Sequence, residues 1–184
     1  MFEFSHWLEQ THVSLAIQTA GWVIPAVQII HILCICIVLG SILAIGLKVW
    51  GGVLPDIRLG AVVRRFGPWL WTALVGLLLT GTILIVAEPI RELYSLAFWI
   101  KMGLIIVGGT VTAYFQVHMR RNAAKWDAGA YNRGLTRSVT ALTWVVWFAI
   151  AVMGRWIAFD TAVFGDWSPH NHMFDAQTTK TPTP

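Results

Sequence analysis

The chain has few charged residues. Asp, Glu, Lys and Arg make up 12% of its 184 residues, whereas an ordinary soluble domain has about 25%. Hydrophobic residues make up 57% of the sequence, and the mean hydropathy is +0.66. The charges lie between long apolar runs, so this composition argues against an ordinary soluble domain and favours a small integral membrane protein.

Cysteine is also scarce. Cys34 and Cys36 are the two cysteines of the chain, and both lie in one apolar run. Residues two apart on a helix point to different sides, so we expect no disulfide between them. A redox CxxC motif and a zinc-binding spacing are absent. We therefore interpret both cysteines as buried and unreactive.

Common catalytic motifs are missing as well. The sequence has no HExxH, P-loop, GxGxxG or GxSxG, so whether the chain is an enzyme stays open. The paired deep histidines of a di-haem cytochrome are absent, because His31 is the one histidine deep inside an apolar run. The N-terminus MFEFSHWLEQ has two glutamates and no basic region, so we expect no cleaved signal peptide.

Four apolar runs are each long enough for a membrane-spanning helix, which needs about 20 residues. They are apolar throughout, unlike the alternating strands of a membrane barrel, and backbone groups in lipid must be paired within the segment. We predict an all-α, integral membrane four-helix bundle within residues 1–160, followed by a polar, flexible tail over 161–184. The predicted spans are 22–47, 68–87, 95–117 and 138–159.

The charges also predict an orientation. Lys and Arg dominate segments 48–67 and 118–137, whereas the N-terminal segment, residues 88–94 and the tail are net acidic. Basic loops stay in the cytoplasm, so both termini would be periplasmic, N-out and C-out, in a bacterial inner membrane. The pI of 9.4 then reflects topology, and we expect no nucleic-acid partner.

The first twenty residues predict a short helix that lies in the membrane interface. Ser5 could cap this helix, and Phe4, Leu8 and Leu15 lie roughly along one side of it. The alternative is a disordered arm.

Polar residues inside the runs are the candidate site. Gln28, His31 and Cys34 recur every three residues on the first run. His31 lies on the order of 13 Å below Trp22, and Lys101 about 9 Å below Ser95, at the helical rise per residue. Glu88, Met153 and Arg155 belong to the same half of the bundle. Thr72, Gly76 and Thr80 recur every four residues and form a small face that permits close helix contact.

Two interpretations of these residues stay open. In one, His31 hydrogen-bonds Gln or Thr across the bundle, while Lys101 and Arg155 reach the headgroups or pair with Glu88, Glu92 or Asp160. In the other, they form a cofactor pocket. Imidazole suits haem iron, copper or zinc, and the cations would bind haem propionates. Met102, Met153 or Lys101 could supply a further iron ligand.

The tail contains a second metal candidate. The stretch WSPHNHMFDA includes His170, His172 and Met173. Two imidazoles and a thioether suit copper. The alternative is a solvated tail without a metal.

One pattern extends over most of the chain. It consists of Trp22, Pro25, His31 and Gly40, followed by GTILIVAEPIRE, AFWIKM and GRWIAF. This pattern resembles a family of small bacterial membrane proteins known as a domain of unknown function, and the resemblance covers about residues 4–160. The family commonly has Glu where this chain has Gln28, which puts proton chemistry at this position in doubt.

A first-helix histidine and the FxxK motif that ends at Lys101 are more distantly similar to two other four-helix families. These are the haem-binding membrane protoporphyrinogen oxidase and the copper-resistance D type of membrane protein. The similarity implies that His31 is an axial ligand of haem b and that Lys101 lines the pocket.

We therefore expect a haem-b redox or electron-transfer protein in the lipid bilayer, whose partner is a quinone or another membrane subunit. A copper-handling protein is one alternative. A non-catalytic accessory subunit is the other, because the eleven tryptophans could serve protein contacts.

Overall fold

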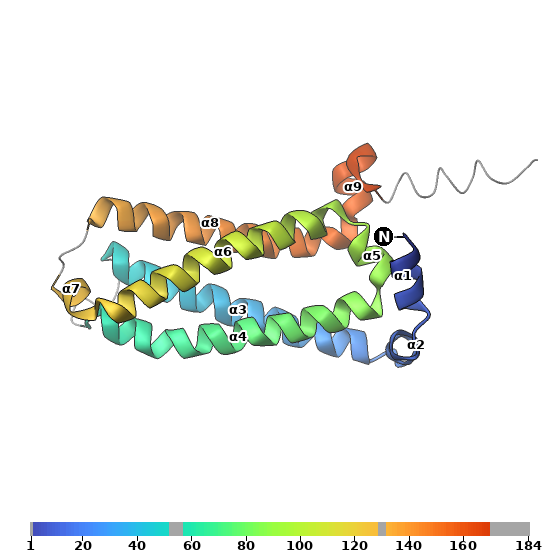
Figure 1. Cartoon of the computed structure of the whole chain (residues 1–184), viewed down its shortest axis with the longest axis horizontal. Coiled ribbons are helices and arrows are strands. Elements are labelled where there is room, and N and C mark those ends of the chain that lie inside the picture. Colours follow the sequence, from blue (N-terminus) through green and yellow to red (C-terminus); the bar gives the residue numbers. More distant parts are fainter. Residues whose placement is uncertain (1, 52–56, 129–131, 170–184) are drawn as a thin grey trace, which may run out of the picture.

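The computed structural model describes residues 2–51, 57–128 and 132–169, and within these ranges every regular element is a helix (Figure 1). Two 3-10 turns, η1 (Ile157–Phe159) and η2 (Gly165–Trp167), flank the last α-helix. The α-helices are α1 (Phe2–Glu9), α2 (His12–Thr19), α3 (Val23–Trp50), α4 (Leu59–Ala87), α5 (Pro89–Leu93), α6 (Leu96–Arg121), α7 (Ala123–Asp127), α8 (Arg133–Trp156) and α9 (Asp160–Phe164).

Four long helices run up and down along the long axis of the molecule (Figure 1). Helix α3 packs against α4 and α8, while α6 packs against α8 and less extensively against α4. Each of α3, α4, α6 and the segment that begins with α8 is long and apolar enough to cross a membrane. The all-helical architecture with four candidate spans is therefore as predicted, and the chain has the character of a multi-pass membrane protein.

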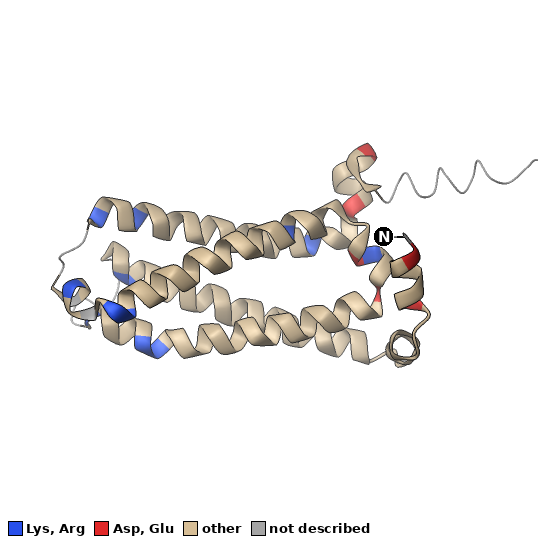
Figure 2. Cartoon of the chain, viewed as in Figure 1, with Lys and Arg blue, Asp and Glu red and all other residues tan. Residues whose placement is uncertain are grey.

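The bundle has two ends that differ in structure. We call the end that carries α1, α2, α5 and α9 the α5 end, and the opposite end, where α7 lies, the α7 end (Figure 1). Lys and Arg gather at the α7 end, and most Asp and Glu lie at the α5 end (Figure 2). The exceptions to this separation include Arg91 of α5, Lys101 of α6 and Arg155 of α8.

Helix α4 begins at Leu59, well before the predicted start at Pro68. The sequence predicted the span from its apolar run, which begins at Pro68. The structure carries the helix through Pro68 because the preceding turns have their own buried face. Leu59, Val62 and Val63 are buried, whereas Arg64 and Arg65 on the other side are exposed.

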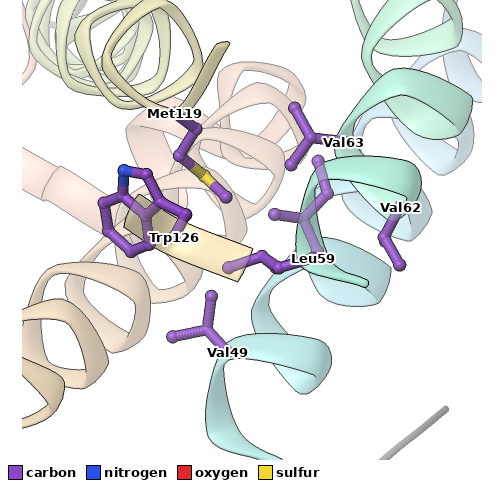
Figure 3. Packing of buried hydrophobic residues seen from close by; sticks show 7 residues of the cluster. Val49, Leu59, Val62, Val63, Met119 and Trp126 are labelled. Carbon is purple, nitrogen blue, oxygen red and sulfur yellow. The ribbon is translucent and has the colours of Figure 1, made fainter. Parts of the chain in front are cut away.

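The apolar core has one cluster at the α7 end, a second in the middle of the bundle and a third, made of Ala97, Phe98 and Ile157, at the α5 end. The first packs α3, α4, α6 and α7 together, and Figure 3 shows Met119 and Trp126 facing the side chains of α4. The second comprises Val38, Ile42, Leu70, Ala73 and Trp147. Beside it, a Cβ on Gly46 would lie 2.5 Å from the Trp144 indole. Glycine therefore lets that ring reach the α3 backbone, where its Nε1 donates to the Ile42 carbonyl at 3.2 Å.

The N-terminal segment forms two short helices, whereas the sequence predicted one. Thr11 separates them, because its hydroxyl accepts a hydrogen bond from Ser14 N at 3.4 Å and caps α2. Ser5, the expected cap, is instead buried inside α1. Gln18 Nε2 donates to the Ala87 carbonyl at 2.9 Å, so α2 is held against the end of α4.

A buried carboxylate holds the C-terminal segment to the start of α6. Asp160 Oδ1 accepts hydrogen bonds from Ser95 Oγ at 2.7 Å and from Ala97 N at 3.1 Å. Its other oxygen accepts from the Ser168 hydroxyl. A carboxylate at a helix N-terminus is favourable because the unpaired backbone N–H groups carry partial positive charge. This clamp fixes the geometry of the α5 end.

Candidate functional site

The candidate site is centred on His31, which is half-buried on α3 where that helix packs against α4. Its Nδ1 lies 2.7 Å from Thr80 Oγ1. Thr80 is buried, and its hydroxyl also lies 2.6 Å from the Gly76 carbonyl. The imidazole is therefore fastened to α4 through a hydroxyl that is itself fastened to the helix backbone.

This chain of bonds assigns the tautomer of the ring. A hydroxyl has one proton to donate, and the Thr80 proton goes to the Gly76 carbonyl, which can only accept. The His31 contact must then be donated by Nδ1–H to Thr80 Oγ1. In the neutral imidazole this leaves the lone pair on Nε2. Nε2 is thus the ring atom available to a metal or to a hydrogen-bond donor.

Small residues on α4 create the room for this arrangement. A Cβ on Gly81 would lie 3.6 Å from His31 Cε1, an ordinary contact, whereas one on Gly76 would lie 2.8 Å from Cys34 Sγ. Gly76 is therefore required for the close approach of α3 and α4. Cys34 is half-buried, but Cys36 is exposed on the surface of the bundle. The expectation that both cysteines are buried was wrong for Cys36, because α3 is covered on one side only.

Lys101 lies within electrostatic range of both His31 and Glu92. The Lys101 side chain passes close to Gly154 of α8, because a Cβ atom added to that glycine would lie 3.8 Å from Lys101 Cδ. Lys101 Nζ lies 5.3 Å from the centre of the Phe98 ring. Glu92 is the considered partner within electrostatic range of Lys101, but the two side chains form no ion pair in the described part of the chain.

Glu92 itself is 7% exposed. Burial raises the pKa of its carboxyl above the ordinary value, and the charges of Lys101 and Arg91 oppose part of that rise. Sequence reasoning treated Glu92 only as a pairing partner, because nothing in the motif EPIRE shows which of its two glutamates faces inward.

The other candidate residues do not converge on His31. Glu88 forms an ion pair with Arg91. The same guanidinium has its Nη2 3.7 Å from Glu92 Oε1. Arg155 is exposed, with its guanidinium 5.2 Å from the centre of the Phe159 ring. Gln28 is exposed on α3. Of the five predicted cofactor-binding residues, His31 and Lys101 are the two that the structure brings into range of each other.

Metal binding outside His31 has little support within the described residues. Across 2–51, 57–128 and 132–169, no three His, Cys, Asp or Glu side chains lie together in a group that could hold a metal ion. The tail residues His170, His172 and Met173 lie outside the described residues. Thr80 is the neighbour of His31 that the sequence could indicate only indirectly, as part of the small face of α4.

Comparison with known proteins places residues 4–160 in a single family. The chain belongs to the Family of unknown function (DUF6644), whose model matches this range. No curated protein and no solved structure matches the chain. The family agrees with the resemblance carried by the sequence motifs, and the function has to be argued from the site.

Proposed function

We propose that this chain is a b-type haem-binding protein that acts in redox chemistry or electron transfer in the bacterial inner membrane, with His31 as an axial ligand. The observation that carries the proposal is the Nδ1–H hydrogen bond to Thr80. Metal-bound histidines usually donate their second ring N–H to a neighbouring acceptor, which fixes the ring and raises the basicity of the ligating nitrogen. In the structure, His31 already donates its Nδ1–H to Thr80 and leaves Nε2 available as the ligating nitrogen.

A lone imidazole favours haem over an ion held by side chains. Haem iron receives four nitrogens from the porphyrin, so one or two protein ligands suffice. Zinc sites typically use three or four protein ligands, and copper sites likewise combine several. The described residues contain no such group. The distant similarity of the FxxK motif to a haem-binding family points the same way.

Lys101 and Arg155 would bind the propionate groups of the haem. Lys101 lies within electrostatic range of His31. Arg155 stacks on Phe159 and forms no ion pair among the described residues. Each can donate charge-assisted hydrogen bonds to a propionate or to a quinone carbonyl. Haem would supply the one-electron chemistry, and a quinone or another membrane subunit would exchange electrons with it.

The distribution of charge supports the orientation within this proposal. The Lys and Arg residues at the α7 end would lie on the cytoplasmic side. Both termini would then be periplasmic, with α1 and α2 in the plane of the outer interface. His31 would lie in the periplasmic half of the membrane.

The test is an absorption spectrum of the protein purified in mild detergent after expression with ample haem. We expect a Soret band and, after dithionite reduction, sharp α and β bands. His31→Ala should abolish them, whereas His118→Ala should leave them unchanged, because His118 is exposed and stacks on Tyr114 at the other end of α6. A featureless wild-type spectrum, or an intact spectrum in folded His31→Ala protein, would reject the proposal and direct the search to copper and to partner subunits.

A further inference from the structure

The α7 end carries a group of basic side chains that the proposed haem site does not use (Figure 2). They lie on the first turns of α4, on the last turn of α6 and on α7. The ion pairs found among the described residues lie in or beside α1 and α5, so none of these cations is paired with a described carboxylate. Their charge is available to an anionic partner. The exposed members of the group are Arg64, Arg65, Arg120, Arg121 and Lys125.

Arg120 belongs to the last turn of α6, but its guanidinium lies against α4. A Cβ added to Gly67 would lie 3.0 Å from Arg120 Nη2. Side chains on a helix tilt toward its N-terminus, so Arg120 points back along α6, away from the α7 end. Gly67 is buried and Arg120 is exposed. The absence of a side chain at Gly67 therefore lets an exposed guanidinium lie directly on the α4 backbone.

The Arg120 guanidinium lies at the level where the apolar run of α4 begins, because Gly67 immediately precedes the predicted span of 68–87. Trp69 and Trp71 follow on α4, about 3 and 6 Å further along the helix. They are 63% and 40% exposed. Exposed tryptophans are typical of the depth at which lipid headgroups meet the hydrocarbon. The guanidinium thus lies at the depth expected for headgroups.

Arg64 supplies a second guanidinium on the same surface. It lies three residues before Gly67, and residues three apart share one face of a helix, with Cβ atoms about 5–6 Å apart. Arg64 is exposed, and its side chain tilts toward the start of α4 at the α7 end. Arg120 therefore lies at the level of Gly67, and Arg64 lies about one turn nearer the α7 end. Guanidinium groups bind phosphate through paired, charge-assisted hydrogen bonds.

We propose that Arg64 and Arg120 bind the phosphate headgroup of an anionic phospholipid against Gly67, on the surface formed by α4 and α6. The acyl chains would lie on exposed apolar side chains such as Val75 and Leu78, about two and three turns further along the same side of α4. An anionic headgroup is favoured over a zwitterionic one, because the cation of the latter is repelled by the arginines. A free phosphate would lack the contact with the apolar surface. The inference does not depend on the proposed haem function.

The experiment is native mass spectrometry of the full-length protein in mild detergent with equal amounts of dioleoyl phosphatidylglycerol and dioleoyl phosphatidylcholine. The two lipids have the same acyl chains and differ in headgroup charge. One basic side chain near an anionic lipid contributes about fivefold in affinity, so two should give the wild type a preference of about tenfold or more for phosphatidylglycerol. Arg120→Gln should lower this preference about fivefold, and Arg64→Gln should lower it as well. Arg133→Gln is the matched control, since it removes one exposed arginine of α8 at the same end of the bundle, and it should leave the preference unchanged.

Gly67→Ala tests the geometry of the site, because it keeps every charge and places a Cβ 3.0 Å from Arg120 Nη2. The guanidinium must then move, and the preference should fall toward that of Arg120→Gln. Arg64→Gln and Arg120→Gln alter exposed side chains, so they test the site even if Gly67→Ala fails to fold.

Three outcomes would overturn the site. One is equal binding of the two lipids by the wild type. Another is an equal loss of preference in Arg120→Gln and Arg133→Gln, which would mean that the whole basic end attracts anions without a specific site. The third is displacement of phosphatidylglycerol by excess inorganic phosphate, which would identify the ligand as a free phosphate. We expect inorganic phosphate to leave lipid binding unchanged.

Discussion

The two ends of the bundle differ in where their charged side chains lie. At the α7 end the interior is apolar, with Trp126 packed among aliphatic side chains and Met119, while Arg64, Arg65 and Arg120 are exposed. At the α5 end the carboxylates of Glu92 and Asp160 are buried. A buried charge is costly unless it is paired or hydrogen-bonded. The basic side chains of the α7 end thus lie on the surface, whereas the buried carboxylates of the α5 end are part of the tertiary structure.

Both ends have a buried apolar cluster, so loss of apolar volume should destabilise either end. Loss of a single carboxylate should destabilise only the α5 end, where Glu92 and Asp160 are buried. The substitutions below test the contrast, beginning with the largest expected effect.

The largest loss of stability is expected for Trp126→Ala at the α7 end. Trp126 is 8% exposed and packs edge-on against Phe115, and truncation of a buried Trp costs about 3–5 kcal/mol. Unfolding by denaturant in detergent measures this cost. Trp69→Ala is the control, because Trp69 is 63% exposed on α4. Equal destabilisation by the two variants would contradict an apolar core at this end.

At the α5 end, Asp160→Ala is expected to cost roughly 3 kcal/mol, because it leaves the hydrogen-bond donors of Ser95, Ala97 and Ser168 without their acceptor. The same unfolding measurement applies, and Asp160→Asn should recover part of the loss. Asp166→Ala, which removes an exposed carboxylate nearby, should be close to neutral. A neutral Asp160→Ala variant would show that the clamp does not stabilise the fold.

Thr80→Val should have a smaller effect, about 1–2 kcal/mol, because it removes the two hydrogen bonds of the hydroxyl, with His31 and with the Gly76 carbonyl, and keeps the side-chain volume. The variant frees His31 Nδ1, so the tautomer is no longer fixed. If His31 holds haem, the reduction potential should shift, whereas Thr82→Val, which alters an exposed threonine of the same helix, should leave it unchanged. A potential that is equal in both variants would argue against the role assigned to Thr80.

The smallest effect concerns the pH dependence of stability. The pKa of Glu92 is raised in the folded state, so its contribution is fully present below the pKa of the unfolded chain and is lost as pH rises through the folded pKa. Glu92→Gln should therefore flatten the decline of stability above pH 4.5. The change in the pH dependence of the unfolding free energy is small, because the charges of Lys101 and Arg91 already offset part of the cost of burying the Glu92 carboxylate. Unfolding curves at several pH values test this, with exposed Glu3→Gln as control. A slope unchanged by Glu92→Gln would contradict the shift.

The long elements were largely predictable, and the site was predictable only in part. The four apolar runs indicated four helices because a span must be long, apolar and internally hydrogen-bonded. Helix α4 extends beyond the predicted span, because Leu59, Val62 and Val63 give its first turns a buried face that the apolar run alone did not indicate. His31 was identifiable as a polar residue inside a span. Its partner was not, since Gln and Thr residues on several helices were equally plausible.

By itself, the sequence determined that the chain is helical, that four segments can cross a membrane and that basic charge lies at one end. These properties follow from composition and spacing along one helix at a time. Tertiary structure decided which polar groups meet: His31 with Thr80, Ser95 with Asp160 and Gln116 with Trp71. The reason is that each pairing depends on how the helices rotate and approach one another. Contacts such as that of Gly76 with Cys34 set this geometry, and no local pattern encodes it.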